Sequence, residues 1–185
     1  MNNKQDILIR REWSMPNSRT FEIKPIRDLI MKYVDFVNDG VIVDPFANNN
    51  KIATITNDLD PQYDTDFHMD ATDFLKTLQD RSADLVLYDP PYSQRQVAEC
   101  YKSLGKTVNM QTTQISYWTN QKKEIARILK QNGYCITFGW NSNGVGMKYG
   151  MEIVEILLVA HGSHHNDTIC TVERKVGFPE NVQLF

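Results

Sequence analysis

The chain of 185 residues has no run of eighteen or more apolar residues, and its first six residues, Met1 to Asp6, are mostly polar. A helix that spans a bilayer needs about 20 apolar residues, and a signal peptide needs an apolar core. The sequence also lacks internal repeats, low-complexity tracts and Pro/Gly/Ser-rich linkers. We therefore expect a single domain over residues 1–185, without a membrane span or a signal peptide, in the cytoplasm.

Cysteine is scarce, and no two cysteines are close in the sequence. Cys100, Cys135 and Cys170 form no CxxC pair, so neither a disulfide framework nor a zinc site is expected. Three histidines between residues 161 and 165 lie without cysteine or glutamate at ligand spacing. We interpret that segment as a solvated loop and predict no metal site.

An excess of positive charge is also missing, because the formal net charge is −3. Proteins that bind nucleic acid through its phosphates are often basic, so the charge counts slightly against such a partner. Acidic residues concentrate between Asp58 and Asp84, however, and basic residues recur on both sides of that segment. Such segregation is compatible with one positive face.

Apolar runs and helical periodicity alternate along the chain. The expected strands are residues 41–43, 52–56, 83–88, 134–138, 152–160 and 168–175. Residues 19–37 are expected to form an entry loop followed by a helix, and three further helices are expected over residues 71–78, 97–104 and 115–131. Asn132-Gly133 is interpreted as the stop of the last helix, and residues 139–150, with four glycines, as a loop. This order predicts an α/β fold with a mostly parallel sheet, helices on both faces and a C-terminal antiparallel hairpin.

Two acidic turns follow predicted parallel strands directly. Asp44-Pro45-Phe46 follows residues 41–43, and Asp89-Pro90-Pro91-Tyr92 follows residues 83–88. Ligands of such sheets bind beyond the carboxyl ends of the strands. The sequence therefore predicts that both turns line one site.

The Asp89-Pro90-Pro91-Tyr92 turn has the residue types for holding an amine. Two prolines stiffen the backbone and remove two N–H donors, so the turn presents a carboxylate and carbonyl oxygens that accept hydrogen bonds from an NH2 group. Tyr92 offers a ring on which an unstacked base can lie. The turn resembles the (D/N/S)PP(Y/F/W) signature of the amino-group methyltransferases that act on adenine or cytosine in DNA. The resemblance implies Asp89, Pro90, Pro91 and Tyr92 as catalytic residues.

Further segments resemble the cofactor motifs of the same family. Asp44-Pro45-Phe46-Ala47-Asn48 is similar to DPFxGxG, which wraps the methionine part of S-adenosylmethionine, although asparagines such as Asn48 replace the glycines. Asparagine is the next most tolerant residue of left-handed conformations. The resemblance implies that Asp44, Pro45, Phe46 and Asn48 bind the cofactor.

An acid after the second strand takes the ribose hydroxyls in this type of fold. Asp58 is the first candidate and Asp60 the second. Asp70, followed by Ala71, resembles the acid that accepts from the cofactor adenine amine, and the same side chain can cap the following helix. Upstream, Thr20 and the Lys24-Pro25 pair resemble a family segment that closes over the cofactor carboxylate, with Lys24 or the Thr20 hydroxyl as its contact.

The resemblance covers roughly residues 19–138 and implies a Rossmann-like S-adenosylmethionine-dependent methyltransferase. With aspartate in DPPY, it implies transfer to the 6-amino group of adenine in DNA, without a metal. A target-recognition domain is missing, so loops 93–113 and 139–149, a homodimer or a partner subunit are left to supply recognition. Arg95, Trp118 and Trp140 are candidates for a nucleic-acid face, although packing is the expected role of Trp118.

Two alternatives remain. Guanine-amino methyltransferases of ribosomal RNA carry a similar DPP(Y/F) turn in chains of similar length, whereas protein glutamine methyltransferases generally carry NPPY, so Asp89 argues against that substrate. The second alternative is a methyltransferase-like protein that has lost catalysis and acts by binding.

Overall fold

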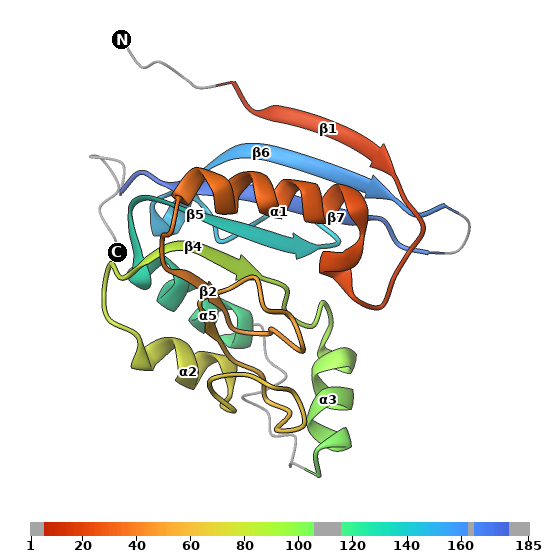
Figure 1. The fold of residues 1–185 in the computed structure, drawn as a ribbon, viewed down its shortest axis with the longest axis vertical. Helices are drawn as coiled ribbons and strands as arrows, with labels where there is room; N and C mark the ends of the chain where they lie inside the picture. Colours follow the sequence, from red (N-terminus) through yellow and green to blue (C-terminus); the bar gives the residue numbers. More distant parts are fainter. Residues whose placement is uncertain (1–5, 106–115, 163–164, 178–185) are drawn as a thin grey trace.

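The computed structural model describes residues 6–105, 116–162 and 165–177, which form a seven-stranded sheet of order β1-β6-β7-β5-β4-β2-β3 (Figure 1). The strands are β1 (Leu8–Trp13), β2 (Ile42–Asp44), β3 (Ile55–Thr56), β4 (Ala83–Tyr88), β5 (Leu129–Gly139), β6 (Met151–Ala160) and β7 (Thr168–Lys175). Only β7 runs antiparallel to its two neighbours among these strands. The predicted mostly parallel sheet with a C-terminal hairpin is confirmed.

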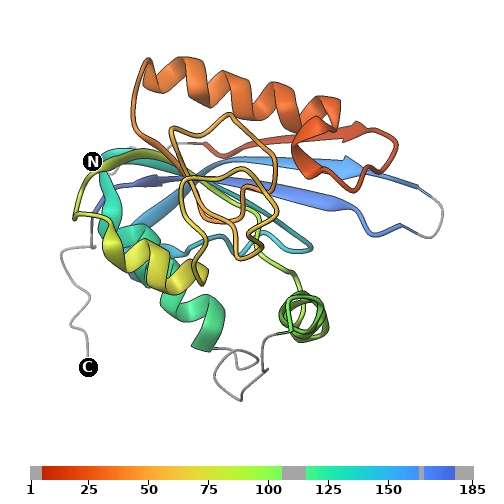
Figure 2. The same ribbon diagram turned by 60° about the horizontal axis from the view of Figure 1, so that its bottom comes forward.

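Helices cover both faces of the sheet (Figure 2). The helices are α1 (Lys24–Val37), α2 (Ala71–Thr77), α3 (Gln94–Ser103) and α5 (Ser116–Ile128). α1 buries Ile26, Leu29 and Ile30 against one face, while α2 and α5 pack on the other through residues such as Phe74 and Ile125. Within the described residues no helix has the length and apolarity to cross a bilayer.

The predicted helix over residues 115–131 is wrong at its end, and its first residue lies outside the described part. α5 ends at Ile128, and β5 begins at Leu129, which pairs with Ala83 of β4. Asn132 adopts a left-handed φ of 64°, and the pairing with β4 is irregular on this side. Asn132-Gly133, interpreted from the sequence as a helix stop, therefore forms a kink inside a strand. Leu129, before the kink, pairs with β4 and does not continue the helix.

The second predicted strand is shorter than expected. Residues 52–54 are not paired, and only Ile55 and Thr56 form β3. Thr54 N donates to the carbonyl of Ile42 at 2.9 Å, but Ile42 N donates to the Thr54 hydroxyl and not to a main-chain carbonyl, so the ladder stops there. β1 was not predicted, since its sequence Leu-Ile-Arg-Arg-Glu-Trp shows no alternation of apolar and polar residues and is mostly exposed.

Residues 140–150, between β5 and β6, form a loop with one turn of 3-10 helix at Met147–Tyr149. The buried Glu173 carboxylate accepts from Val145 N at 2.5 Å and from Gly146 N at 2.8 Å. Gly144 has a φ of +54°, and a Cβ there would overlap the same carboxylate. The buried Glu173 carboxylate thus holds this loop in place. Among the described elements, no helix covers the face of β6 and β7 that lies next to the loop.

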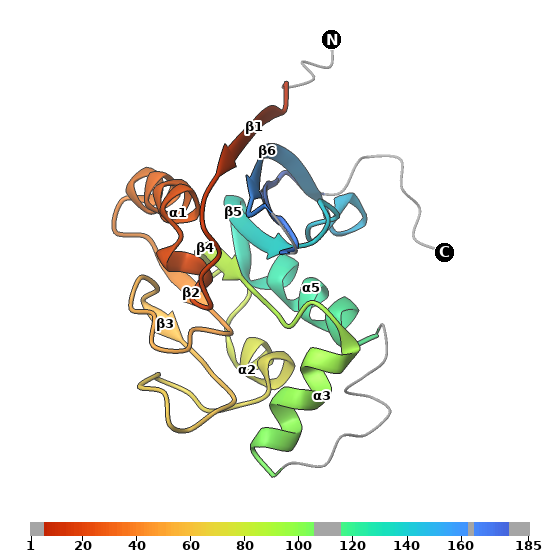
Figure 3. The ribbon, with the colours of Figure 1, turned by 90° about the vertical axis from the view of Figure 1, so that its right-hand side faces the viewer.

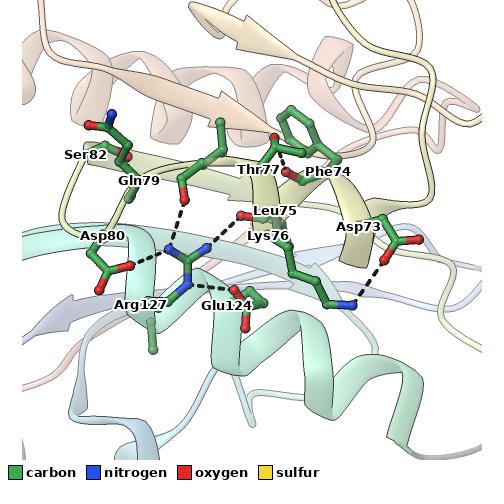
Figure 4. Close-up of polar contacts among 12 residues, drawn as sticks. Asp73, Phe74, Leu75, Lys76, Thr77, Gln79, Asp80, Ser82, Glu124 and Arg127 are labelled. Carbon is green, nitrogen blue, oxygen red and sulfur yellow. Dashed lines mark hydrogen bonds and ion pairs between the residues drawn. The ribbon is translucent and has the colours of Figure 1, made fainter.

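Arg127 joins α2 to α5 (Figure 4). Its guanidinium donates to the carbonyls of Leu75 and Leu78 at 2.9 Å each, and pairs with Asp80 and Glu124 at 2.5 and 2.7 Å. Because the last carbonyls of a helix lack partners within the helix, we expect Arg127→Met to lower the free energy of unfolding by about 1–3 kcal/mol. Urea unfolding measures this change.

Lys76→Met is the matched control, because it removes only an exposed ion pair with Asp73 on the same helix. Its expected effect is within about 0.5 kcal/mol. Equal effects of the two substitutions would show that Arg127 does not fasten α2.

Candidate active site

The DPPY turn follows β4 and is held by contacts from two helices. The Tyr92 hydroxyl donates to Asp89 Oδ1, and Tyr92 N donates to Gln96 Oε1 at 2.7 Å. From α5, Trp118 Nε1 donates to the carbonyl of Pro91 at 3.0 Å. The turn is therefore fixed on both sides, and its geometry does not rest on the prolines alone.

Burial dominates the electrostatics of this turn. It raises the pKa of Asp89, while hydrogen bonds from Tyr92 and Thr20 act in the opposite direction. The pKa of Tyr92 is also raised, first by burial and then by the Asp89 carboxylate. Tyr92 is thus a neutral donor, and Thr20, from the segment before α1, lies beside the acid.

Asp44, at the end of β2, is a buried carboxylate with an unused acceptor. Its residue is 1% exposed; Oδ1 accepts from Phe46 N at 3.0 Å, but Oδ2 has no partner. Burial raises the pKa of Asp44 to about 8, and the Asp89 and Asp58 carboxylates add to the rise. A buried acceptor without a partner costs free energy, so this site favours a ligand that brings a donor or a positive charge.

The asparagine-rich turn after β2 adopts a conformation that glycine usually takes. Asn48 has a φ of 49°, and its N–H donates to Asp58 Oδ2 at 3.0 Å. Asp58 Oδ1 accepts from Asp60 N at 2.9 Å, and burial raises the pKa of Asp58. Asn48 thus fills a left-handed position, and Asp58 ties the turns after β2 and β3 together.

Asp70 caps α2 and also faces the cavity. Its Oδ1 accepts from Thr72 N at 2.8 Å, and its Oδ2 accepts from the Tyr101 hydroxyl. Tyr101 comes from α3 and packs with Tyr117 of α5. Sequence reasoning missed both tyrosines as site residues; their only signal was that Tyr101 follows Val97 at helical spacing, which equally fits a core position.

These segments enclose a cavity of about 410 Å³ at the carboxyl ends of the strands. It brings together eleven of the predicted site residues: Thr20, Pro45, Phe46, Asn48, Asp58, Asp70, Ala71, Asp89, Pro90, Pro91 and Tyr92. A second cavity of about 370 Å³ lies between residues 18–22 and 46–50, and it also reaches Asp89. Asp89 therefore lies where the two cavities meet, at the edge of the sheet where the two acidic turns predicted a site.

Lys24 and Pro25 are not at the cavity wall. The Lys24 side chain is 82% exposed and pairs with Asp28 at 2.6 Å, while Pro25 is buried in the first turn of α1. Of the two predicted contacts for a cofactor carboxylate, the structure places only Thr20 at the cavity. Asp44 lies beneath the wall rather than in its lining.

The other candidates have local partners. Trp140 is 46% exposed, with its ring centroid 5.5 Å from that of Tyr92, and Arg95 pairs with Glu99 at 2.7 Å. His161 contacts Ser14 O and Thr168 Oγ1, each at 2.9 Å. Within the described part of the chain no group of three metal-binding side chains occurs; His164 lies outside that part.

No protein-family model matches this chain, and no curated protein sequence is significantly similar to it. Solved structures do resemble it. TrmN from Thermus thermophilus superimposes with a TM-score of 0.57 at 13% identity, over 83% of this chain and 49% of TrmN, so the chain spans about half of that protein.

Two further structures are matched over most of their length. A SAM-dependent methyltransferase from Methanosarcina mazei gives a TM-score of 0.54 at 11% identity, over 80% of this chain and 97% of the other. The N-methyltransferase NodS from Bradyrhizobium japonicum, in complex with S-adenosylhomocysteine, gives 0.52 at 11% identity, over 86% and 89%. The chain therefore has the Rossmann-like fold of the S-adenosylmethionine-dependent methyltransferases.

Proposed function

We propose that this protein transfers a methyl group from S-adenosylmethionine to the exocyclic 6-amino group of adenine in DNA. The observation that carries the proposal is the position of Asp89, at the meeting point of two cavities and in a turn with acceptors but no proline N–H donors. An enzyme that transfers a methyl group from a cofactor to a base must bind both molecules side by side, and two adjoining cavities allow this. The fold supports the cofactor class, and the DPPY resemblance supports the substrate.

The residues of the larger cavity fit S-adenosylmethionine. Asp44 lies beneath the cavity wall rather than in its lining; its Oδ2 is buried without a partner and suits the cofactor ammonium, directly or through water. Asp58 and Asp70 lie on the wall toward α3 and suit the ribose and the adenine. When bound, the cofactor supplies a methyl group on a positively charged sulfur, and this chemistry needs no metal.

The DPPY turn orients the attacking amine. The lone pair of an exocyclic base amine is delocalised into the ring, so the amine is a weak nucleophile. The Asp89 carboxylate and a proline carbonyl accept its two hydrogens and favour a tetrahedral nitrogen, chiefly by orientation and electrostatics. Tyr92 and the neighbouring Trp140 provide rings against which an unstacked base can lie.

Target recognition is the less developed part of the chain. Two cations near the cavity are paired, Arg19 with Glu22 and Arg95 with Glu99, so these two are not free for phosphates without rearrangement. We propose that a second subunit or the loops beside the site contribute recognition, and that the protein acts in the cytoplasm.

Transfer of labelled methyl from S-adenosylmethionine to unmethylated duplex DNA, single-stranded DNA and ribosomal RNA, followed by digestion to nucleosides, tests the proposal. We expect label in N6-methyladenine from DNA. Label in guanine of RNA would replace the substrate and keep the chemistry. No transfer together with no cofactor heat in calorimetry would favour a binding protein without catalysis.

Cys100 provides a direct probe of the cofactor cavity. It is an exposed thiol that lines the cavity, whereas Cys135 and Cys170 are buried. We expect a maleimide to label Cys100 and S-adenosylhomocysteine to slow that labelling at least several-fold. Adenosine triphosphate serves as the control ligand; equal labelling rates with and without S-adenosylhomocysteine would show that the cofactor binds elsewhere.

Trp118 is expected to position the DPPY turn rather than only to pack. Trp118→Phe keeps most of the ring but removes the 3.0 Å bond to the Pro91 carbonyl. Loss of one such bond corresponds to about 3–10-fold in rate. We expect kcat to fall by that factor while the Kd for the cofactor stays constant; a change confined to the Kd would assign Trp118 to cofactor binding.

A further inference from the structure

β1 is an edge strand whose outer side pairs with no described strand. Ser14 N donates to Ala160 O at 3.1 Å. The main-chain N–H and C=O groups of successive residues point to opposite sides of a strand, so those of the even-numbered residues of β1 point toward β6. The odd-numbered Ile9, Arg11 and Trp13 direct their N–H and C=O groups outward. Such an open row is a template for another strand.

Two of these odd-numbered residues, Ile9 and Trp13, carry apolar side chains on a face of the sheet that no described helix covers. Ile9 is 70% and Trp13 65% exposed, and the pairing register places Ile9 beside Ile156 and Arg11 beside Leu158, both half-buried. Figure 3 shows β1 at the edge of the sheet with α1 on one side only. No described helix covers the other side, and the chain between β5 and β6 forms the loop of residues 140–150 instead of a helix of that kind.

We propose that this edge forms a homodimer, in which β1 pairs antiparallel with β1 of a second copy about a two-fold axis at Arg11. Residues that exchange both main-chain bonds must both face outward, so odd-numbered residues pair with odd-numbered ones. With the axis at Arg11, Ile9 lies opposite Trp13 and Arg10 opposite Glu12 of the other copy. An axis at Arg10 or at Glu12 would instead place that residue opposite its own copy.

This register places the positive Arg10 of each copy opposite the negative Glu12 of the other. The strand is then complementary to itself, as a two-fold interface requires. Arg10 already bonds to the buried Glu155 at 2.9 and 3.1 Å and to Glu12 of its own strand at 2.9 Å, so its guanidinium is held along the strand. Arg11 meets its own copy at the axis, and like charges directly opposite each other are unfavourable.

Sedimentation of the full chain tests the interface. We expect a concentration-dependent dimer, which the double substitution Ile9→Lys and Trp13→Lys converts to a monomer. Phe36→Lys, at an equally exposed apolar position on α1 (67%), is the matched control and should remain dimeric. Arg11→Thr removes the repulsion and should lower the dimer Kd several-fold.

Cysteine pairing tests the register. Arg10→Cys, Arg11→Cys and Glu12→Cys are each made with Cys100→Ser, because the two remaining native thiols are buried. Oxidised glutathione takes up the two electrons as two thiols form a disulfide. Paired Cα atoms about 5.5 Å apart suit a disulfide, so Arg11→Cys should cross-link fastest.

A wild-type chain that stays monomeric at all accessible concentrations would overturn the interface. So would a dimer that survives the double lysine substitution, or faster cross-linking at position 10 or 12 than at position 11. None of these measurements depends on methyl transfer, so their outcome is separate from that of the proposed function.

Discussion

Replacement of Asp89 by alanine is expected to reduce methyl transfer by about 10²–10³-fold, since one preorganised polar contact to the reacting group is commonly worth that factor in kcat. Asp89 lies at the junction of the two cavities and belongs to a turn that other contacts hold in place. Removal of its carboxylate should therefore leave the turn formed. The cofactor Kd, measured by calorimetry, should change little.

Asp89→Asn separates two roles of this acid. If Asp89 acts as an acceptor that orients the amine, the asparagine carbonyl oxygen retains part of the activity, and Asp89→Asn falls between wild type and Asp89→Ala. If the negative charge itself is required, both substitutions are equally inactive. Tyr92→Phe completes the series, because it frees Asp89 Oδ1 from the tyrosine hydroxyl and keeps the stacking ring. Full activity of Asp89→Ala would remove this residue from the mechanism.

The sequence predicted those parts of the fold that depend on local pattern. β4 has the predicted bounds because its apolar run, Leu85 to Tyr88, ends at Asp89-Pro90, where proline stops the ladder. The cap of α2 by Asp70 was also predictable, since an acid before an apolar helix face is a local signal. The motifs then converge because parallel strands share one carboxyl edge.

Features that depend on distant partners were not predictable. The end of α5 at Ile128 is set by pairing of Leu129 with Ala83, about one-quarter of the chain away. β1 pairs with β6 and is joined to it by the bond of Arg10 to Glu155, and a six-residue strand of mixed polarity has no periodic signal. The contact of Tyr101 with Asp70 joins α3 to α2. The sequence around either residue does not predict the other as its partner.

Asp44 links the stability of the apoprotein to cofactor binding, and Asp44→Asn is expected to change both. Its pKa of about 8 lies above the usual value because the carboxyl is buried. The folded apoprotein therefore binds a proton that the unfolded chain releases near pH 4. The contribution is fully present below that pH and is lost as the pH rises toward 8, at up to about 1.4 kcal/mol per pH unit.

Urea unfolding of the apoprotein at pH 5 and pH 8 measures this linkage. Wild type should lose stability between the two values, and Asp44→Asn should lose much less, whatever its stability at pH 5. A charge-assisted hydrogen bond to the cofactor ammonium is worth about 1.5–3 kcal/mol, so Asp44→Asn should also weaken cofactor binding about 10–100-fold. The two effects have one cause, because the unpartnered oxygen that strains the apoprotein at pH 8 is the one that the cation satisfies. A flattened pH dependence without a loss of affinity would mean that the cofactor ammonium binds away from Asp44.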